Sequence, residues 1–522
     1  MSAHDTDVLI VGAGPVGLTL AIELARAGVP HRLIDRAAEP SPLSRAAGIH
    51  SRTLQLLERS GVIEPFLDEG LEVRRGEIAM DGTPRAWFDL SELDERFPFI
   101  IDLPQARTEA LLADHLAGLG GRIERGVALV GLFADADGVD VQLQRDGDQA
   151  AEAMRCRWVI GCDGGHSTVR TLAPTQLHGS FKGERVLLVD AECEWDVDWP
   201  VLRMSLNRHG LAGSFPFTGR RARFFAQLGD LDLADDPTLD DAQRTLADLL
   251  SPTLRLTEAH WITTLTLHHG QVPRYRFGRV LLAGDAAHIH SPAGGQGMNT
   301  GMQDAWNLAW KLVLVSRGAD EALLDSYDRE RHPVGARVVK LTTRATRIAM
   351  TTVPGVHRLR DTLVGAMVGR DGVRQRLELG LTELDIAYHH SPIVGEHVRH
   401  AADDLVEPGD RLPDAGDLAT ALPAGRHAAL VVRPVTADDV TTVLDALGDL
   451  AEVIAVVTTP MADLPEGATA LVDPDDAIAD ALGLGASGVV VVRPDAYVGY
   501  VTVPVDGDGL RHYRTLLGLP TG

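Results

Sequence analysis

Three glycines near the N-terminus have a spacing that binds phosphate groups. Gly12, Gly14 and Gly17 follow the apolar run Asp7–Val11 and open a stretch of good helix formers, Pro15–Ala27. The first glycine allows a tight turn, the second lets the backbone approach a pyrophosphate, and the third permits close packing of the helix on the strand. The helix N-terminus adds free N–H groups and partial positive charge. The motif therefore predicts a dinucleotide site, without choosing between FAD and NAD.

An acidic residue completes this predicted site. Asp35 ends a second expected strand, His31–Asp35, about 20 residues further on, where a carboxylate can accept hydrogen bonds from a ribose. A second glycine series, Gly483 to Gly488, has the same spacing but follows a helical pattern and precedes a strand. That order is the reverse of the one that a dinucleotide site requires, so we assign the second series to a turn.

Two later segments place an aspartate beside a glycine after an apolar strand. Asp163 and Gly164 stand in CDGGHSTVR, and Gly284 and Asp285 stand in LAGDAAH. Taken singly, Asp285 is equally explained as a capping residue and Asp163-Gly164 as a surface turn. Taken together with the glycine motif, the chain resembles the single-component FAD-dependent aromatic hydroxylases typified by p-hydroxybenzoate hydroxylase. It resembles most the longer actinobacterial polyketide and phenol hydroxylases, which carry a thioredoxin-like C-terminal domain.

The resemblance implies non-covalently bound FAD and a role for individual residues. Asp163 would serve both FAD and NAD(P)H, Asp285 would hold the flavin ribose, and Arg45 would lie near the pyrophosphate. Arg36 and Gln105 would lie near the adenosine, although Arg36 and Arg45 are also explained as solvated surface charges. The cofactor-binding residues expected in this way are Gly12, Gly14, Pro15, Val16, Gly17, Asp35, Arg36, Arg45, Gln105, Asp163, Gly164, Gly284, Asp285, Pro292, Gly295, Gly297, Met298 and Asn299.

A glycine-rich loop, Ser291–Asn299, leads into an expected helix near Gly301. Backbone N–H groups at such a helix start can stabilise negative charge on a reduced flavin, and we expect Pro292, Gly294 and Gly297 near the ring. The resemblance implies that NADPH or NADH binds transiently and reduces FAD. A flavin C4a-hydroperoxide formed with O₂ would then hydroxylate an aromatic or polycyclic polyketide-type molecule. The cofactor carries this chemistry, so no catalytic side chain is assigned.

Other flavoprotein functions share part of this pattern. A Baeyer–Villiger or epoxidising monooxygenase would show every one of these motifs, and the sequence leaves that alternative open. An FAD dehydrogenase or halogenase would run a different reaction, and the Trp-x-Trp-x-Ile segment of related halogenases is absent. A non-enzymatic FAD-fold binding module would lack the loop near Pro292–Asn299. The sequence thus favours a monooxygenase.

The hydrophobic patterning predicts an α/β protein with a Rossmann-like FAD-binding domain, an inserted mostly β substrate domain and a C-terminal thioredoxin-like α/β domain. Phe215, Phe217, Phe225 and Pro292 are candidate substrate contacts, with sheet core the favoured explanation for Phe215 and Phe217. No cysteine follows Cys193, so the last domain cannot run thiol–disulfide chemistry. The expected boundaries are 1–70, 101–179 and 271–350 for the FAD-binding domain, 71–100 and 180–270 for the substrate domain, 351–400 for a helical connection and 401–522 for the last domain, with a linker around 400–415.

Composition narrows the partners. With 49 basic and 74 acidic residues the net charge is −25, which disfavours nucleic acid and anionic membranes. The paired histidines lack the carboxylate or cysteine neighbours of a metal site, so we expect no metal. The sequence shows neither a secretory signal nor an apolar run long enough to span a bilayer. We expect a cytoplasmic enzyme with a small aromatic or polyketide substrate, and the sequence allows a homodimer.

Overall fold

The computed structural model describes residues 5–41, 46–80, 82–207, 210–228, 236–289, 295–349, 371–399 and 404–520. The contacts between residues divide the chain into two units. The first comprises Met1–Ala21, Arg32–Gln303 and Gly335–Leu384, and the second comprises Ile22–His31, Asp304–Val334 and Asp385–Gly522.

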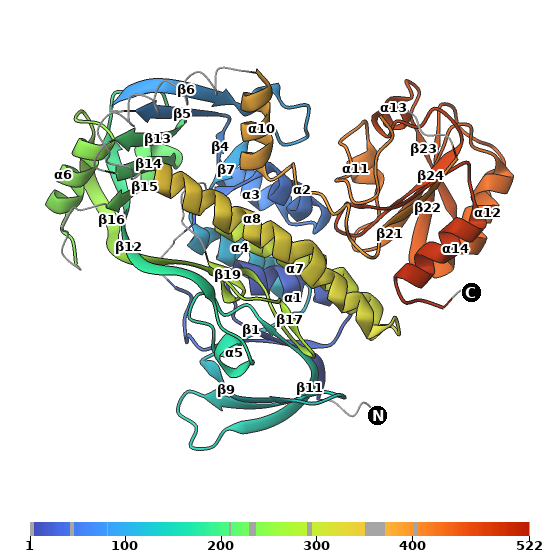
Figure 1. Ribbon diagram of the computed structural model, residues 1–522, viewed down its shortest axis with the longest axis horizontal. Coiled ribbons are helices and arrows are strands. Elements are labelled where there is room, and N and C mark those ends of the chain that lie inside the picture. The colour runs from blue at the N-terminus through green and yellow to red at the C-terminus, as the bar shows by residue number, and fades with distance from the viewer. Residues whose placement is uncertain are drawn as a thin grey trace. The chain divides into compact units, whose positions relative to one another are not determined.

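A largely parallel sheet in the first unit holds the glycine motif (Figure 1). Its apolar strands are buried on both faces, as a sheet covered by helices requires. Strand β1 pairs in parallel with β11, and β11 pairs in parallel with β18. The strand order is β17 (Arg276–Phe277), β18 (Val280–Leu282), β11 (Glu152–Gly161), β1 (Thr6–Val11), β2 (His31–Asp35) and β8 (Ile123–Arg125), with β10 (Val139–Arg145) and β9 (Val127–Ala134) added beside β11.

Two of the helices beside this sheet, α1 (Pro15–Arg26) and α4 (Gln105–Gly118), match helices expected from the sequence to within two residues. The sequence pattern predicts a helix over Arg107–Leu119 and a strand over Val159–Asp163. In the structure the helix runs from Gln105 to Gly118, and the strand ends two residues earlier than predicted, at Gly161. The helices are α1 (Pro15–Arg26), α2 (Ser51–Arg59), α3 (Ile63–Glu69), α4 (Gln105–Gly118) and α5 (Thr168–Leu172). This confirms the Rossmann-like fold predicted for the nucleotide domain.

A second, mostly antiparallel sheet forms the predicted β-rich layer (Figure 1). Helix α6 (Leu239–Leu249) packs on one face, where Phe224, Leu246 and Leu187 are fully buried. The opposite face carries Leu188, Phe215, Phe217 and Phe225, and it borders the site described below. The strand order is β19 (His288–Ile289), β16 (Arg255–Gln271), β12 (His178–Glu194), β15 (Arg221–Leu228), β14 (Gly210–Pro216), β13 (Leu202–Asn207), β5 (Arg75–Met80) and β6 (Thr83–Asp89).

A small sheet in the same unit lies close to the site. Strand β7 (Ile100–Asp102) pairs in antiparallel fashion with β3 (Gly48–Ile49) on one side and β4 (Leu71–Val73) on the other. In the first of these pairs Gly48 stands opposite Asp102.

Long helices follow the second sheet along the chain: α7 (Gln296–Ser316), α8 (Asp325–Ala349) and α10 (Asp371–Thr382). Helix α7 begins five residues before the expected start near Gly301. A β-carbon on Gly301 would lie 2.8 Å from Val16 Cγ2, so this glycine allows the helix to pack closely against the glycine motif. Gly301 is therefore compatible with a place inside helix α7.

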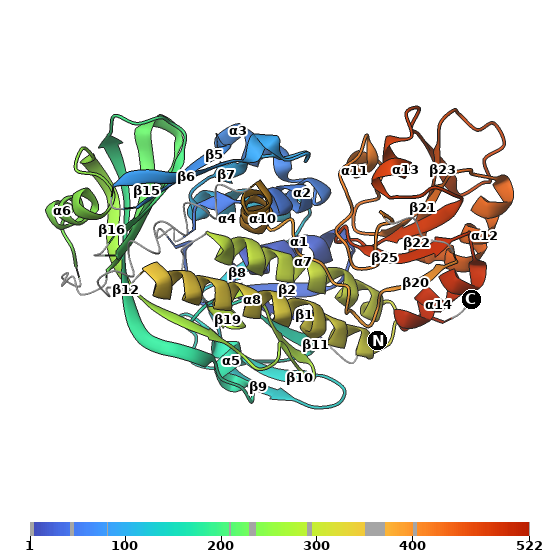
Figure 2. The ribbon, with the colours of Figure 1, turned by 45° about the horizontal axis from the view of Figure 1, so that its top comes forward.

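The second unit contains a thioredoxin-like domain with helices on both faces of a mixed sheet (Figure 2). Helices α12 (Ala437–Leu447) and α14 (Gly507–Leu516) pack against each other and the sheet. Residues of α11 (Leu418–Ala421) and α13 (Ala477–Ala481) share a core with the other face. The strand order is β20 (Gly395–Val398), β25 (Val498–Val503), β24 (Gly488–Val492), β21 (His427–Val432), β22 (Ala451–Val457) and β23 (Ala468–Val472).

The segment expected to be a linker packs on this domain instead. The N–H groups of Val406, Gly409 and Leu412 donate to the backbone carbonyls of Leu482, Val498 and Ala496. Its prolines and glycines serve tight turns, since Gly409 adopts a φ of +97° against the backbone of Tyr388. The described residues 404–415 are thus part of the last domain.

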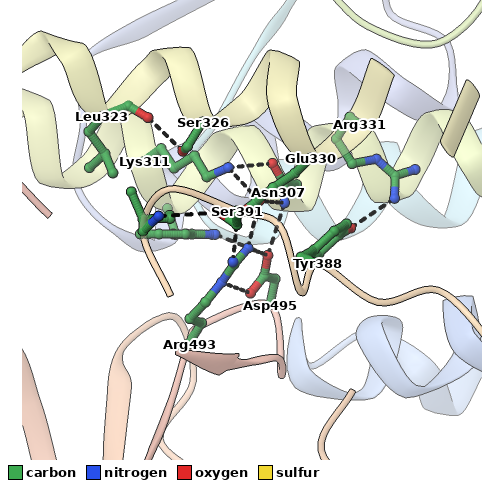
Figure 3. A network of polar contacts seen from close by, with 12 residues as sticks. Asn307, Lys311, Leu323, Ser326, Glu330, Arg331, Tyr388, Ser391, Arg493 and Asp495 are labelled. Atoms are coloured by element: carbon green, nitrogen blue, oxygen red, sulfur yellow. Dashed lines mark hydrogen bonds and ion pairs between the residues drawn. The ribbon is translucent and has the colours of Figure 1, made fainter. Parts of the chain in front are cut away.

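A buried network of charges joins this domain to the later part of α7 and the first part of α8 within the second unit (Figure 3). Arg493 donates to both oxygens of Glu330, at 2.7 and 2.9 Å, and to Asp495 at 2.7 Å. Lys311 Nζ lies 2.7 Å from Glu330 Oε2. Arg331 donates to Asp304 and to the Tyr388 hydroxyl. The side chains of Arg493, Glu330 and Lys311 are fully buried, so these ion pairs are shielded from water.

Candidate functional site

The three predicted motifs meet at one edge of the parallel sheet. Val11 stands opposite Gly161 in the β1–β11 ladder, and Gly161 stands opposite Leu282 in the β11–β18 ladder. Each motif begins within two residues of its strand's end. The carboxyl edge of such a sheet is where α/β folds bind ligands, so the sheet brings all three motifs to one place.

The glycine turn has the shape of a phosphate cradle. Gly12 has a φ of +104°, and a β-carbon there would lie 2.5 Å from the Cys162 carbonyl oxygen. A β-carbon on Gly17 would lie 1.9 Å from the Gly12 carbonyl oxygen, so both positions require glycine. Gly14, in contrast, has no atom within 4 Å of its missing β-carbon and faces a cavity. The cradle therefore fits the pyrophosphate of a dinucleotide.

Asp35 both holds this turn and faces a cavity. Its Oδ2 accepts a hydrogen bond from Ala13 N, and its Oδ1 accepts one from Ala37 N, each at 2.8 Å. The cavity beside it has a volume of about 250 Å³ and is lined also by Arg36, Val127 and Leu129. The arrangement is suited to an adenosine whose ribose approaches the carboxylate.

Asp163 and Gly164 line the same cavity. The Asp163 carboxylate accepts hydrogen bonds from Ser167 Oγ at 2.5 Å and from the backbone of Thr168 and Val169 at 2.6 and 3.1 Å. It therefore also caps the short helix α5. Gly164 adopts a φ of +77°, which few other residues tolerate.

A larger cavity of about 660 Å³ extends from the glycine turn to the second sheet. At one end it is lined by Gly14, Pro15, Val16, Gln105 and Asp285. At the other end the lining is mainly apolar but includes an arginine and two threonines; these residues are Leu188, Phe215, Phe225, Leu265, Arg223, Thr264 and Thr266. One cavity thus joins the predicted cofactor site to an aromatic wall of the inserted sheet.

The start of helix α7 borders this cavity through Gly295, Gly297 and Met298. Asn299 fixes it in place, because its amide nitrogen donates to Gly48 O at 2.9 Å and its amide oxygen accepts from His50 N at 2.9 Å. Free N–H groups and the helix dipole concentrate positive charge at this end of the helix.

The remaining predicted residues are distributed as follows. Phe217 lines a different cavity, of about 290 Å³, next to the large one's wall. Gly284 packs under Val16, with a φ of +57°. Arg45, Pro292 and Gly294 lie outside the residues that the structure describes.

The sequence analysis did not single out individual charged residues of the second sheet. Arg223 is buried, lines the large cavity and donates to Asp190 at 2.8 Å, while Arg221 donates to the other oxygen of Asp190 at 2.5 Å. Burial alone would raise the pKa of Asp190, but the two arginines hold it below its ordinary value. Two arginines alternating with alanine in an otherwise apolar strand were the available signal. Asp190 therefore stays ionised and positions a cation at the cavity wall.

No group of three or more His, Cys, Asp or Glu side chains within the described residues is arranged to hold a metal ion. No helix in the described ranges is long and apolar enough to cross a membrane.

Comparison with known proteins gives consistent matches. A family model of the FAD binding domain matches residues 5–342. The 12-dehydrotetracycline 5-monooxygenase/anhydrotetracycline 6-monooxygenase of Streptomyces rimosus subsp. rimosus is 34% identical over 98% of this chain and 99% of its own length. The rifampicin monooxygenase of Streptomyces venezuelae is 38% identical over 73% of this chain and 79% of its own. The solved structure of OxyS anhydrotetracycline hydroxylase from Streptomyces rimosus has a TM-score of 0.78 at 32% identity, covering 99% of this chain and 100% of that one.

Proposed function

Because the chain belongs to the family of FAD-dependent monooxygenases, we propose that it hydroxylates a polycyclic aromatic molecule of the polyketide type. The observation that carries this proposal is the continuous cavity between the glycine turn and the aromatic wall of the second sheet. Its volume of about 660 Å³ lies within the range of roughly 300–1,000 Å³ found for sites that enclose small molecules. Relatives whose names specify tetracycline-type and rifampicin substrates support the choice of a bulky ring system.

FAD would lie along the carboxyl edge of the parallel sheet. Its adenosine would occupy the cavity beside Asp35 and Arg36, and its pyrophosphate would cross Gly14. The ring would reach the start of helix α7, near Gly297, and Asp285 would face the linking sugar chain. We assign cofactor contacts also to Arg45, Pro292 and Gly294. When bound, FAD supplies the redox chemistry, since it takes electrons from NADPH or NADH and activates O₂.

The chain's own groups would position the substrate and control charge. The buried rings of Phe215 and Phe225 give a flat apolar wall that orients an aromatic ring and excludes water. Arg223 places a guanidinium at the same wall, which favours a negatively charged phenolic oxygen over a neutral one. An ionised phenol is the more electron-rich ring, and this suits electrophilic oxygenation.

The decisive experiment is anaerobic stopped-flow reduction of the bound FAD by NADPH and by NADH, with and without a panel of phenols and polycyclic hydroxyquinones. We expect one polycyclic compound to speed flavin bleaching, and admission of air to give a product heavier by one oxygen atom. The structure of that product distinguishes a phenol from a lactone or an epoxide. A flavin that neither nicotinamide reduces, with any compound present, would refute the proposal.

A matched pair of variants tests the aromatic wall. Phe225→Ala removes a buried ring from the cavity, whereas Phe133→Ala removes a ring that is 67% exposed on strand β9. We expect Phe225→Ala to weaken substrate binding about tenfold or more, in line with the loss of a buried aromatic contact. Phe133→Ala should bind the substrate like the wild type, and equal effects of the two changes would contradict the assignment.

Finer predictions accompany this function. NADPH and NADH are regenerated in the cytoplasm, so we place the enzyme there. We also propose that the enzyme forms a homodimer, which sedimentation equilibrium of the holoenzyme would test. The boundaries of the nucleotide and substrate domains stay predictions.

A further inference from the structure

Two buried titratable side chains near the large cavity have no geometrically defined hydrogen-bond partner among the described residues. His50, directly after strand β3, is 1% exposed, and neither of its ring nitrogens meets a hydrogen-bond partner among the described residues. Asp102, at the end of β7, is 2% exposed, and both of its carboxyl oxygens are equally without a partner in the described part of the chain. Buried polar groups are nearly always hydrogen-bonded, so this pair calls for a functional explanation.

Both side chains lie close to Gly48. A β-carbon on Gly48 would lie 3.3 Å from Asp102 Oδ1 and 3.5 Å from His50 Nε2. Both atoms therefore border the small space that the missing side chain leaves. The ladder between β3 and β7 sets this geometry, because it places Gly48 opposite Asp102 with His50 two residues later.

His50 Nε2 also reaches the large cavity. A β-carbon on Gly295 would lie 3.5 Å from this nitrogen and 3.4 Å from Phe215 Cε1, and both Gly295 and Phe215 line the cavity. Because Gly295 has no side chain, only its backbone lies between the imidazole and the cavity. The hydrogen bond from His50 N to Asn299 Oδ1 connects the His50 backbone to the start of helix α7.

Asp102 faces the other way. It lines the cavity of about 290 Å³ together with Glu192, Arg221 and His260, which are polar groups of the second sheet. The pair thus lies between the proposed substrate cavity and a second, polar cavity.

The surroundings favour uncharged forms of both groups. Burial raises the pKa of Asp102 well above its ordinary value, although Arg223 opposes this. Burial lowers the pKa of His50 to about 4, although the Leu381 backbone opposes this. Burial therefore favours the protonated carboxyl group of Asp102 over the carboxylate, and it favours the neutral imidazole of His50, which can accept a proton.

We propose that His50 and Asp102 carry the proton of the substrate's phenolic hydroxyl out of the large cavity to the second cavity, an inference that rests on the proposed function. Asp102 first releases its proton to water entering the second cavity. The substrate O–H bond then breaks, its electron pair stays on oxygen, and the proton adds to Nε2. His50 passes this proton to the Asp102 carboxylate, which restores both groups. The net change is transfer of one proton, with no change of oxidation state.

The test measures ionisation without turnover. The oxidised holoenzyme, without NADPH or NADH, is mixed in a stopped-flow instrument with 1,2-dihydroxyanthraquinone and related hydroxyanthraquinones, whose phenol and phenolate forms differ in colour. In the wild type we expect the phenolate band to appear after binding. In His50→Gln and Asp102→Asn we expect the rate of that appearance to fall about a hundredfold, the scale of lost general acid–base catalysis, while binding followed by flavin fluorescence stays within about threefold.

Two further variants separate proton transfer from folding. Gly48→Ala keeps both titratable groups but places a methyl group between them, and it should slow ionisation too. His427→Gln removes a buried histidine of the second unit and should behave like the wild type. FAD content and melting temperature report on folding in every variant.

The outcomes are distinguishable. Ionisation at the wild-type rate in both His50→Gln and Asp102→Asn, or a wild type that leaves each bound anthraquinone protonated, would overturn the proton path while leaving the proposed function intact. Failure of every compound to bind, with no oxygenated product in the turnover assay, would refute the proposed function and this inference with it.

Discussion

Replacing Arg493 by alanine should destabilise the second unit severely. In the wild type the guanidinium bridges Glu330 and Asp495, and all three side chains are at most 2% exposed (Figure 3). In the variant, Glu330 keeps Lys311, and Asp495 keeps the Trp310 indole N–H. Two buried carboxylates would then face one ammonium group, so one negative charge would lose its compensation away from water.

The expected size follows from the burial of these groups. Burial alone would raise the pKa of Glu330, but Arg493 and Lys311 together hold it far below its ordinary value. Removing one partner of such a buried pair costs about 3–5 kcal/mol. For a unit of about this size each kcal/mol shifts the melting temperature by about 2–4 °C, so we expect a fall of ~10 °C.

Differential scanning calorimetry, supported by limited proteolysis, measures this fall. Arg493→Lys keeps the charge but loses the two-pronged contact with Glu330, and it should lose about half as much. Arg426→Ala is the matched control, because Arg426 pairs with Glu452 at the surface of the same domain and such pairs contribute about 0–1 kcal/mol. An Arg493→Ala protein that melts within about 2 °C of the Arg426→Ala protein would refute the reasoning.

The remaining predictions concern the glycine turn and a buried histidine. Gly14→Ala should fold normally, because its β-carbon meets open space, yet retain FAD at least about tenfold less tightly after gel filtration, since the methyl group occupies the place of the pyrophosphate. Gly17→Ala should lose both FAD and several degrees of melting temperature, because its β-carbon collides with Gly12; equal melting of the two variants would contradict this. Burial lowers the pKa of His427 to about 3, so the unfolded chain binds the extra proton below pH 6.5 and stability is lost as the pH falls. Between pH 8 and pH 5 the free energy of unfolding of the wild type should fall by about 2 kcal/mol more than that of His427→Gln. Urea unfolding measures both values, and an equal fall in the two proteins would rule this out.

Local signals in the sequence predicted several of the elements closely. The sequence pattern predicts a helix over Ala437–Leu447, and the helix has the same bounds in the structure, because its apolar periodicity and its capping threonine act within a few residues. Glycines in α7 were harder to interpret. Gly297 and Gly301 place the expected helix start too late in the chain. In the structure Gly301 packs against Val16, and only this contact explains why a glycine stands at that position.

Partnerships between distant residues were beyond the sequence. Glu330 and Arg493 are 163 positions apart, and nothing in either segment indicates the other. His50 and Asp102 are unremarkable in their local patterns, and they meet only because a two-residue ladder pairs β3 with β7. Asp163 was assigned to cofactor binding from its motif, and the structure adds that it caps helix α5. Motifs thus indicate which residues gather at a sheet edge, while burial and pairing decide their ionisation.

The buried network also explains what a thioredoxin-like domain without redox cysteines can contribute. A catalytic thiol domain needs an exposed reactive site, whereas this domain directs Arg493 and Asp495 into a fully buried cluster with residues of α7 and α8. Burying ions is costly, and apolar residues would often stabilise a fold as well. Ion pairs, unlike apolar contacts, lose their compensation when the partners shift by one helical turn. The network therefore holds Asn307, Lys311 and Glu330 in one fixed register.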